Sequence, residues 1–356
     1  MIFLFWIVEL LGFFKRKKQH SFQHVAILFL SGGIGDLIML SPIIQRMKDL
    51  FPNASLTLVT DKLDIVQWNG IRVINKETFV QERHTVDLLV SPTLSLRYIP
   101  HLFFVKNWIG YFATPTLQAN WKISKYQYNP QLGHYLWRGV YLLQALDPEA
   151  GDIFEKYVQQ QSVDYPALHQ IEPSSFQKIL QGKKYLVVGI FSKHPDRQWP
   201  KEHFASVITD ITTQYQIEKV VLVGDTSDHD RQEAERLLHL LSLPQDQVFN
   251  LVGKTSLAET AYVIARSTLF LGVDSGPSHM AYLLAPRSLV IFVTVRPEDR
   301  LPLQQSLTQK IKAISPLREG EQPLYSGLSE VPLEAAQKYV RRITPEEVLS
   351  AIESLM

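Results

Sequence analysis

The sequence predicts an α/β protein made of two doubly wound domains, and three observations support this prediction. Short apolar runs rich in β-branched residues alternate with longer segments of helical periodicity, which is typical of βα units around a parallel sheet. The alternation occurs in both halves of the 356-residue chain, a length that suits two domains of about 150 residues each. Between the halves, residues 159–184 are rich in Gln, Ser, Pro and Lys and lack a strand pattern, so we place the domain junction there.

The first half opens with a strand, a helix and a second strand. Residues 25–30 form an unbroken apolar run, as expected of a buried strand in a parallel sheet. Residues 36–50 follow with a helical pattern that ends before Pro52, because proline cannot continue a helix. Residues 56–59 form the next expected strand.

The second half follows the same pattern and closes with a capped helix. We expect strands at 185–190, 219–223, 268–273 and 288–293, and helices at 201–213, 228–241 and 257–266. A final helix begins at Thr344, because Thr344, Pro345 and Glu347 fit the N-cap, N1 and N3 positions of a capping box. The expected parts are an N-terminal segment (1–20), an N-terminal domain (21–170), a C-terminal domain (171–343) and a C-terminal helix (344–356).

The composition excludes several kinds of chemistry. The chain has no cysteine, which rules out disulfides, thiolate zinc sites and a cysteine nucleophile. Its 36 Lys and Arg nearly cancel its 35 Asp and Glu, so no global positive field attracts nucleic acid. The acidic residues of Asp228-His229-Asp230 fit the start of a helix better than a metal site, and the other histidines are scattered. We therefore predict no metal and no nucleic-acid partner.

The first 20 residues are unlike the rest of the chain. Residues 1–14 are apolar except for Glu9 and Gly12, and a basic cluster follows at residues 15–18. The run is shorter than the roughly 20 residues of a spanning helix, and its charge follows the apolar run instead of preceding it as in a signal peptide. The pattern favours a segment that binds the membrane surface, with basic residues on anionic lipid. The alternative is a helix that docks on the protein's own core.

A glycine-rich turn follows the first strand, at residues 31–36 (Ser-Gly-Gly-Ile-Gly-Asp). Glycines let a ligand approach the backbone, and the helix start offers N–H groups to an anion. A dinucleotide fingerprint would need a third glycine where Ile38 stands, which disfavours a nicotinamide enzyme. Asp36 would repel a phosphate, so it is either a base that faces a hydroxyl or an ordinary first-turn acid.

A second turn of this kind occupies residues 272–279 (Gly-Val-Asp-Ser-Gly-Pro-Ser-His). Its serine hydroxyls, its glycine and a helix start predict a cradle for a diphosphate. A serine hydrolase using Asp274, Ser275 and His279 is disfavoured, because the G-x-S-x-G elbow is absent. Gly253-Lys254-Thr255 imitates the end of a P-loop, but Val248 stands where that motif needs its first glycine.

Five motifs in one order resemble glycosyltransferase family 9, the ADP-heptose:lipopolysaccharide heptosyltransferases. They are S-G-G-I-G-D, F-S-K-H-P-D-R-Q-W-P-K-E-H-F, V-L-V-G-D, N-L-V-G-K-T-S-L-A-E and G-V-D-S-G-P-S-H-M-A, and the resemblance covers roughly residues 25–352. It implies a GT-B fold, in which two Rossmann-like domains face a central cleft and the C-terminal helix crosses back to the N-terminal domain. It also implies inversion at the anomeric carbon without a covalent intermediate.

The resemblance also implies roles for individual residues. Asp36 matches the family's catalytic base, which deprotonates the acceptor hydroxyl as it attacks the sugar C1. Arg197 matches a lysine or arginine that contacts the departing diphosphate, where a fixed positive charge stabilises the leaving group. The residues implied to bind the donor are Gly33, Gly35, Ser192, Lys193, Gly224, Gly253, Lys254, Asp274, Ser275, Gly276, Ser278 and His279.

The chain departs from the family pattern after the second turn. Residues 284–288 (Leu-Ala-Pro-Arg-Ser) and 292–294 (Phe-Val-Thr) stand where the family has Gly-Thr-Pro and Phe-Gly, which leaves the donor sugar open. On the acceptor side, residues 106–128 are aromatic and modestly basic. This stretch suits stacking on sugars and contact with anionic lipid, or else a solvated loop with core aromatics.

The predicted function is that of an inverting, metal-independent enzyme of the heptosyltransferase type. By resemblance it moves heptose from a nucleotide-diphosphate sugar, ADP-heptose, to a lipopolysaccharide-core or other glycolipid acceptor, with no separate cofactor. The expected location is cytoplasmic and peripheral, on the inner face of the cytoplasmic membrane. A GT-B sugar-nucleotide epimerase or hydrolase is one alternative, and it would need no lipid anchor. A catalytically silent nucleotide-sugar-binding protein is another, and it would not need Asp36.

Overall fold

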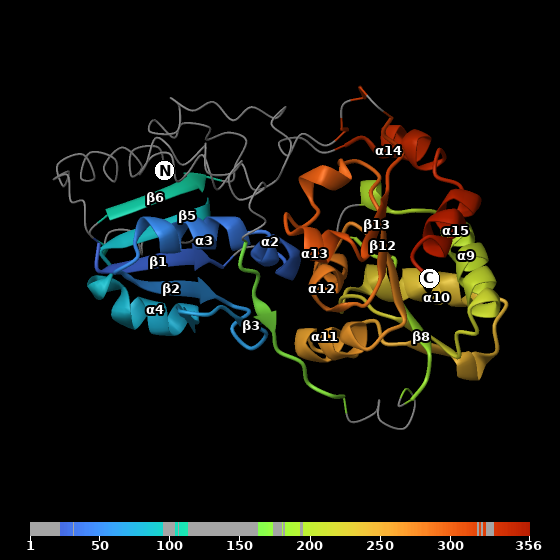
Figure 1. Cartoon of the computed structure of the whole chain (residues 1–356), viewed down its shortest axis with the longest axis horizontal. Coiled ribbons are helices and arrows are strands. Elements are labelled where there is room, and N and C mark those ends of the chain that lie inside the picture. Colours follow the sequence, from blue (N-terminus) through green and yellow to red (C-terminus); the bar gives the residue numbers. More distant parts are fainter. Residues whose placement is uncertain are drawn as a thin grey trace. The chain divides into compact units, whose positions relative to one another are not determined.

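The computed structural model forms two compact units (Figure 1). It describes residues 22–30, 32–94, 104–105, 107–112, 163–173, 180, 182–192, 195–318, 320–321, 323–324 and 331–356. The first unit holds the described residues of Met1–Gly33, Leu40–Asn129 and Leu136–Ala167; the second holds those of Ile34–Met39, Pro130–Tyr135 and Leu168–Met356. The expected segment at residues 1–20 lies outside the described residues, and so does most of the stretch at 106–128.

The first unit is built on a parallel five-stranded sheet with the order β4-β2-β1-β5-β6. Its strands are β1 (His24–Phe29), β2 (Ser55–Thr60), β4 (Ile71–Ile74), β5 (Leu88–Leu94) and β6 (Asn107–Phe112). The helical segments are α3 (Ser41–Leu50), α4 (Lys76–Glu82) and η1 (Arg83–Thr85), and β3 (Val66–Gln67) pairs with β7 (Ala167–Leu168). β1 is central and almost wholly buried, as its apolar sequence predicts.

The second unit is built on a parallel six-stranded sheet with the order β10-β9-β8-β11-β12-β13. Its strands are β8 (Tyr185–Gly189), β9 (Lys219–Leu222), β10 (Val248–Asn250), β11 (Leu269–Val273), β12 (Ser288–Ile291) and β13 (Ile311–Ile314). Its α-helices are α2 (Ile34–Ile38), α9 (Lys201–Gln214), α10 (Asp228–Leu240), α11 (Leu257–Ala265), α12 (Gly276–Leu284), α13 (Gln305–Thr308), α14 (Leu333–Val340) and α15 (Pro345–Glu353). The shorter turns are η5 (Pro195–Arg197), η6 (Gln245–Gln247) and η7 (Pro297–Asp299).

The helix expected at residues 36–50 is two helices. α2 ends at Ile38 and α3 begins at Ser41, with Pro42 in the first turn of α3. Proline lacks the N–H that would continue the helical hydrogen bonds, so the chain breaks before it and starts again. The break separates α2 from its neighbours: Ile34–Met39 belongs to the second unit, and the chain on either side belongs to the first.

The C-terminal helix α15 begins with the expected capping box. Thr344 Oγ1 accepts a hydrogen bond from the Glu347 amide at 3.3 Å, and the Glu347 carboxylate accepts one from the Thr344 amide at 3.0 Å. Its packing differs from the helix that the resemblance implies. Val348 and Ile352 share a core cluster with Phe204 of α9, so the helix packs on the second unit rather than crossing back. Its apolar positions are four residues apart and form one stripe, which fits α9.

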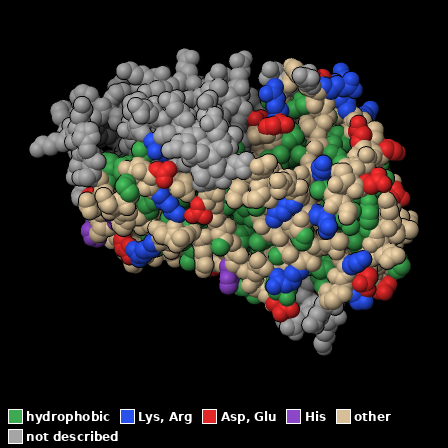
Figure 2. Space-filling model, viewed as in Figure 1, with side chains coloured by type: hydrophobic (Ala, Val, Ile, Leu, Met, Phe, Trp, Pro, Cys, Tyr) green, Lys and Arg blue, Asp and Glu red, His purple; other side chains and the backbone are tan. Residues whose placement is uncertain are grey.

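The surface in Figure 2 carries Lys and Arg side chains interspersed with Asp and Glu over its described part. This distribution agrees with a formal net charge of +1. In the part of the chain that the structure describes, no helix is long and apolar enough to span a bilayer. The domain boundaries at 170/171 and 343/344 and the central cleft stay predictions.

Candidate functional site

The strand order of the second unit reverses between β8 and β11, which pair directly in the sheet. This order is that of a dinucleotide-binding domain, in which ligands bind outside the carboxyl ends of the strands where the order reverses. The loop after β8 and the turn after β11 therefore frame the candidate site. These two segments contain Arg197 and Asp274, two of the residues that the sequence singled out.

Asp274 is the buried centre of this site. It directly follows β11, and its side chain is 2% exposed. Arg197 Nη1 donates to Asp274 Oδ2 at 3.0 Å, and His279 Nε2 lies 3.5 Å from Oδ1. Burial by itself raises the pKa of the Asp274 carboxyl, but the interaction with His279 and the charges of Arg197 and Arg300 hold that pKa well below its usual range. Asp274 is thus an ionised counterion that orients Arg197.

The loop that carries Arg197 is fixed from behind by the C-terminal segment. Trp199 is 2% exposed, and its indole Nε1 donates to the Ile343 carbonyl at 3.1 Å. The Trp199 ring also packs edge-on against Phe204, at a centroid distance of 4.9 Å. η5, which ends in Arg197, lies against α14. These contacts give the Arg197 guanidinium a defined position beside the turn.

The N-terminus of α12 forms the floor of the site. Ser275 is its N-cap and is half-buried, whereas Ser278 is fully buried and donates its hydroxyl to the Val273 carbonyl. The first N–H groups of a helix have no partners within it and carry a partial positive charge, which favours an anion. Ser275 and the helix start can therefore bind an anion, while Ser278 stabilises the turn.

Helix α2 packs on this same turn. A Cβ atom on Gly35 would lie 2.5 Å from Cδ2 of His279, and a Cβ on Gly276 would lie 3.0 Å from Cγ2 of Ile34. Each helix thus uses a glycine to admit a side chain of the other. Asp36, the next residue after Gly35, is half-buried. The structure therefore brings α2, the helix that carries Asp36, onto the second turn.

Gly224 and Gly253 lie together beyond the end of β9. The Gly253 amide donates to the Gly224 carbonyl at 3.3 Å. A Cβ atom on Gly224 would lie 2.6 Å from Cδ2 of Phe191, and Gly253 has a φ of +70°, so both positions need glycine. Lys254 points elsewhere, because its ammonium donates to the Asn250 carbonyl at 2.9 Å.

The remaining predicted residues are less informative. Ser192 is buried in the loop after β8, and Gly33 is half-buried at the start of the first turn. Lys193 lies outside the described residues. Asp228 and Asp230 are in the first turn of α10, where Ser227 is the N-cap. Among the described residues, no group of three His, Asp or Glu side chains is arranged to hold a metal ion.

Two buried residues of the site were missed by sequence reasoning. Tyr282 is 1% exposed, and its ring packs edge-on against His279 at a centroid distance of 5.2 Å. Burial, and then the charge of Asp274, raise the pKa of Tyr282 well above its usual value. Arg300 is 9% exposed and places a second guanidinium near Asp274, in addition to that of Arg197. Tyr282 could have been found by its spacing from His279, whereas Arg300 sits in a mixed-charge segment that looks like ordinary surface.

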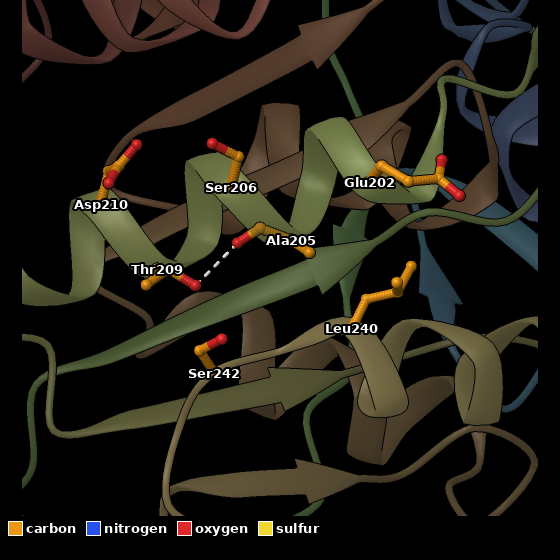
Figure 3. Close-up of a pocket in the computed structure, with 7 residues that line it drawn as sticks. All are labelled: Glu202, Ala205, Ser206, Thr209, Asp210, Leu240 and Ser242. Atoms are coloured by element: carbon orange, nitrogen blue, oxygen red, sulfur yellow. Dashed lines mark hydrogen bonds between the residues drawn. The ribbon is translucent and has the colours of Figure 1, made fainter.

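A shallow pocket on α9 is unsuited to the same ligand (Figure 3). Its lining residues are Glu202, Ala205, Ser206, Thr209, Asp210, Leu240 and Ser242. Its charged groups are the carboxylates of Glu202 and Asp210, which repel a diphosphate. The cationic turn at β11 is therefore the better anion site.

Comparison with known proteins agrees with this geometry. The model of glycosyltransferase family 9 (heptosyltransferase) matches residues 108–323, and the chain belongs to this family. Lipopolysaccharide heptosyltransferase 2 of Salmonella typhimurium is 28% identical over 168 residues, which are 46% of this chain and 43% of that protein. The chain thus matches less than half the length of this curated relative.

Solved structures agree on the fold over nearly the whole chain. A family 9 glycosyltransferase from Veillonella parvula superposes with a TM-score of 0.66 at 16% identity, covering 96% of this chain and 99% of the other. The ADP-heptose LPS heptosyltransferase II of Escherichia coli gives a TM-score of 0.62 at 17% identity, with coverage of 94% and 98%. The predicted GT-B fold with two Rossmann-like domains is confirmed.

Proposed function

We propose that this protein is an inverting glycosyltransferase that uses a nucleoside-diphosphate sugar as its donor. The observation that carries the proposal is the buried Arg197–Asp274 ion pair at the point where the strand order reverses, with α2, which carries Asp36, packed on the neighbouring helix α12. A fixed cation, a helix N-terminus and a nearby half-buried carboxylate are the three groups that a metal-independent sugar transfer needs.

The diphosphate of the donor binds between Arg197 and the N-terminus of α12. Asp274 holds the Arg197 guanidinium in a defined orientation, which reduces the entropy that is lost when Arg197 binds the diphosphate. Ser275 and the amides of the helix start bind the other side of the diphosphate. Gly33, Ser192, Lys193, Gly224, Gly253 and Lys254 belong to the segments that we assign to the rest of the donor.

Asp36 acts as the general base in this scheme. Its carboxylate takes the proton of the acceptor hydroxyl as the hydroxyl oxygen forms a bond to the anomeric carbon. The bond between that carbon and the phosphate oxygen breaks on the opposite face, which inverts the configuration. The electron pair leaves with the nucleoside diphosphate, and the charge of Arg197 stabilises it. The scheme assigns this stabilisation to Arg197 and not to a metal ion.

The donor that we propose is ADP-heptose, and the acceptor is a lipopolysaccharide core or a related glycolipid. The family membership and the heptosyltransferase relatives support this choice. Acceptor-dependent release of ADP from ADP-heptose tests it. Release that increases with acceptor concentration and saturates supports the transferase. Release without any acceptor indicates a hydrolase, and conversion to an epimeric nucleotide sugar without net release of ADP indicates an epimerase. Tight ADP-heptose binding without turnover indicates a silent binding protein.

We further propose that residues 1–20 attach the enzyme to the cytoplasmic membrane surface. The proposal rests on the apolar run and the basic cluster at residues 15–18. Replacing Lys15, Arg16, Lys17 and Lys18 by glutamine should release the full-length protein from anionic vesicles, with neutral vesicles as the control. Unchanged co-sedimentation with anionic vesicles contradicts the attachment.

A further inference from the structure

His279 faces α2 with one edge of its ring. The nearest approach is at Gly35, where an added Cβ atom would lie 2.5 Å from Cδ2, 3.1 Å from Cγ and 3.3 Å from Nε2. A methyl group at 2.5 Å from a ring carbon is well inside van der Waals contact, so it cannot occupy this position unless the ring or the helix moves. The sequence here requires glycine for helix packing and not only for a ligand.

The other contacts of His279 leave its ring little room to move. Nε2 lies 3.5 Å from Asp274 Oδ1, and the ring packs edge-on against Tyr282. Asp274 in turn accepts a hydrogen bond from Arg197. His279 and Tyr282 are 6% and 1% exposed. The imidazole therefore connects the Arg197–Asp274 pair on one side to the backbone of α2 on the other.

A second contact holds α2 in the same place. The side chain of Ile34 fits against Gly276, where a Cβ atom would lie 3.0 Å from Cγ2. Ile34, Leu37 and Ile38 are all buried, although α2 is only five residues long. Such a short helix has little stability of its own, so its position is set by what it packs against. That neighbour is α12, which lies in the same compact unit.

We propose that His279 is a positioning residue that seats α2 on the turn at Asp274, and thereby holds Asp36 at a fixed offset from Arg197. The inference rests on the proposed role of Asp36 as the base. It differs from the donor contact that the family resemblance implies for His279, because the imidazole acts through packing on Gly35 and through Asp274. Removal of the imidazole should change the position of Asp36 but leave its carboxylate in place.

A double-mutant cycle between Gly35 and His279 tests this inference. In Gly35→Ala the new methyl group displaces α2 from the ring, and a shift of about 1 Å in a catalytic group costs about 10²-fold in kcat. The Kd for ADP, measured by calorimetry, should stay within about threefold, because the N-terminus of α12 and Arg197 are retained.

His279→Gln provides the second arm of the cycle. Glutamine keeps an N–H group within reach of Asp274 but replaces the rigid ring by a flexible chain that can yield to a methyl group. In this background Gly35→Ala should reduce kcat less than about tenfold, so the two effects are not independent. If Gly35→Ala does not fold alone, the double variant should still fold, because the clash is gone.

The outcomes separate this inference from the proposed function. An equal loss from Gly35→Ala in both backgrounds overturns the role of His279 and leaves Asp36 as the base. Failure of both Gly35→Ala and the double variant to fold also overturns it, because relief of the clash should restore folding. Normal turnover of Asp36→Asn would show that Asp36 is not the general base, and it would contradict the proposed mechanism itself.

Discussion

The two glycine turns share a strand–turn–helix pattern, but they hold their carboxylates in opposite ways. Asp274 comes before its helix, directly at the end of β11, and is buried against cationic groups. Asp36 comes after its helix has begun, and is half-buried on a five-residue segment. The pattern alone does not distinguish them. The position of the acid relative to the helix start decides whether it becomes a structural counterion or a group that can meet a substrate.

The largest expected effect concerns the first turn. Asp36→Asn keeps the shape of the side chain and removes its basicity, so kcat should fall by about 10²–10⁴-fold, the contribution of a general base. Affinity for ADP should remain within about threefold, because the variant leaves Arg197 and α12 intact. Single-turnover kinetics with a parallel ADP titration measures both quantities. Asp64→Asn, at an exposed aspartate, is the matched control. Near-normal turnover of Asp36→Asn would contradict the assignment of Asp36 as the general base.

The corresponding change in the second turn should affect stability first. Asp274→Asn removes the carboxylate that accepts from Arg197 and faces Arg300, and breaking a buried pair costs about 3–5 kcal/mol of unfolding free energy. Asp36→Asn should cost less unfolding free energy, because Asp36 is half-buried whereas the Asp274 side chain is 2% exposed. Urea unfolding of the two variants gives the contrast. Equal losses of unfolding free energy in the two variants would contradict the distinction between a structural Asp274 and a substrate-facing Asp36.

The pH dependence follows from the lowered pKa of Asp274. A carboxyl whose folded pKa lies below its unfolded value of about 3.9 stabilises the fold above that pH, and the gain is lost as the pH falls toward the folded pKa. The difference in unfolding free energy between wild type and Asp274→Asn should therefore be constant from neutral pH down to about pH 5 and shrink below about pH 4. A difference that grows on acidification would contradict an ionised Asp274.

Arg197 should affect chemistry more than folding. Arg197→Met removes the cation that stabilises the departing diphosphate, and loss of one such group costs about 10²–10³-fold in kcat. ADP should also bind more weakly, which separates this variant from Asp36→Asn. Arg266→Met, at an exposed arginine that stacks on Tyr262, is the control for loss of a guanidinium. Unchanged ADP affinity in Arg197→Met would move the diphosphate away from this turn.

The smallest expected effect lies behind the second turn. Trp199→Phe keeps an aromatic ring in the core but removes the N–H that binds the Ile343 carbonyl, which costs about 1–3 kcal/mol. Because η5 loses part of its support, the Arg197 loop should exchange its amide hydrogens faster. Hydrogen exchange of residues 195–200 measures this. Unchanged exchange there would show that the Arg197 loop is fixed by other contacts.

Much of the fold could be predicted because long apolar runs mark buried parallel strands. β8, β9, β11 and β12 lie within expected runs, and β1 begins one residue before its expected run, at His24. The strands β10 and β13 could not be found, because each is a short run of mixed polar and apolar residues without a continuous apolar stretch around it. The split between α2 and α3 was missed although Pro42 was visible, because the apolar pattern runs across the break.

The candidate site was predictable where it depends on local turns, and not where it depends on distant contacts. Asp274 and Arg197 could be singled out by their motifs, but the ion pair joins residues 77 apart. The packing of Gly35 on His279 joins still more distant segments and gave no sequence signal. Arg300 has no motif at all. Contacts between loops at the ends of different strands depend on the order of the strands in the sheet, and this order cannot be read from a single sequence.

The most direct measurement is the change in unfolding temperature of the wild-type protein with ADP, UDP, GDP and CMP and their sugar conjugates. A ligand at 100 times its Kd stabilises the fold by about 2.7 kcal/mol, which is readily detected. The proposed site predicts a selective increase with ADP and ADP-heptose that is reduced in Arg197→Met and kept in Asp36→Asn. No increase with any nucleoside diphosphate, or an equal increase in Arg197→Met, would contradict a donor site at the turn after β11.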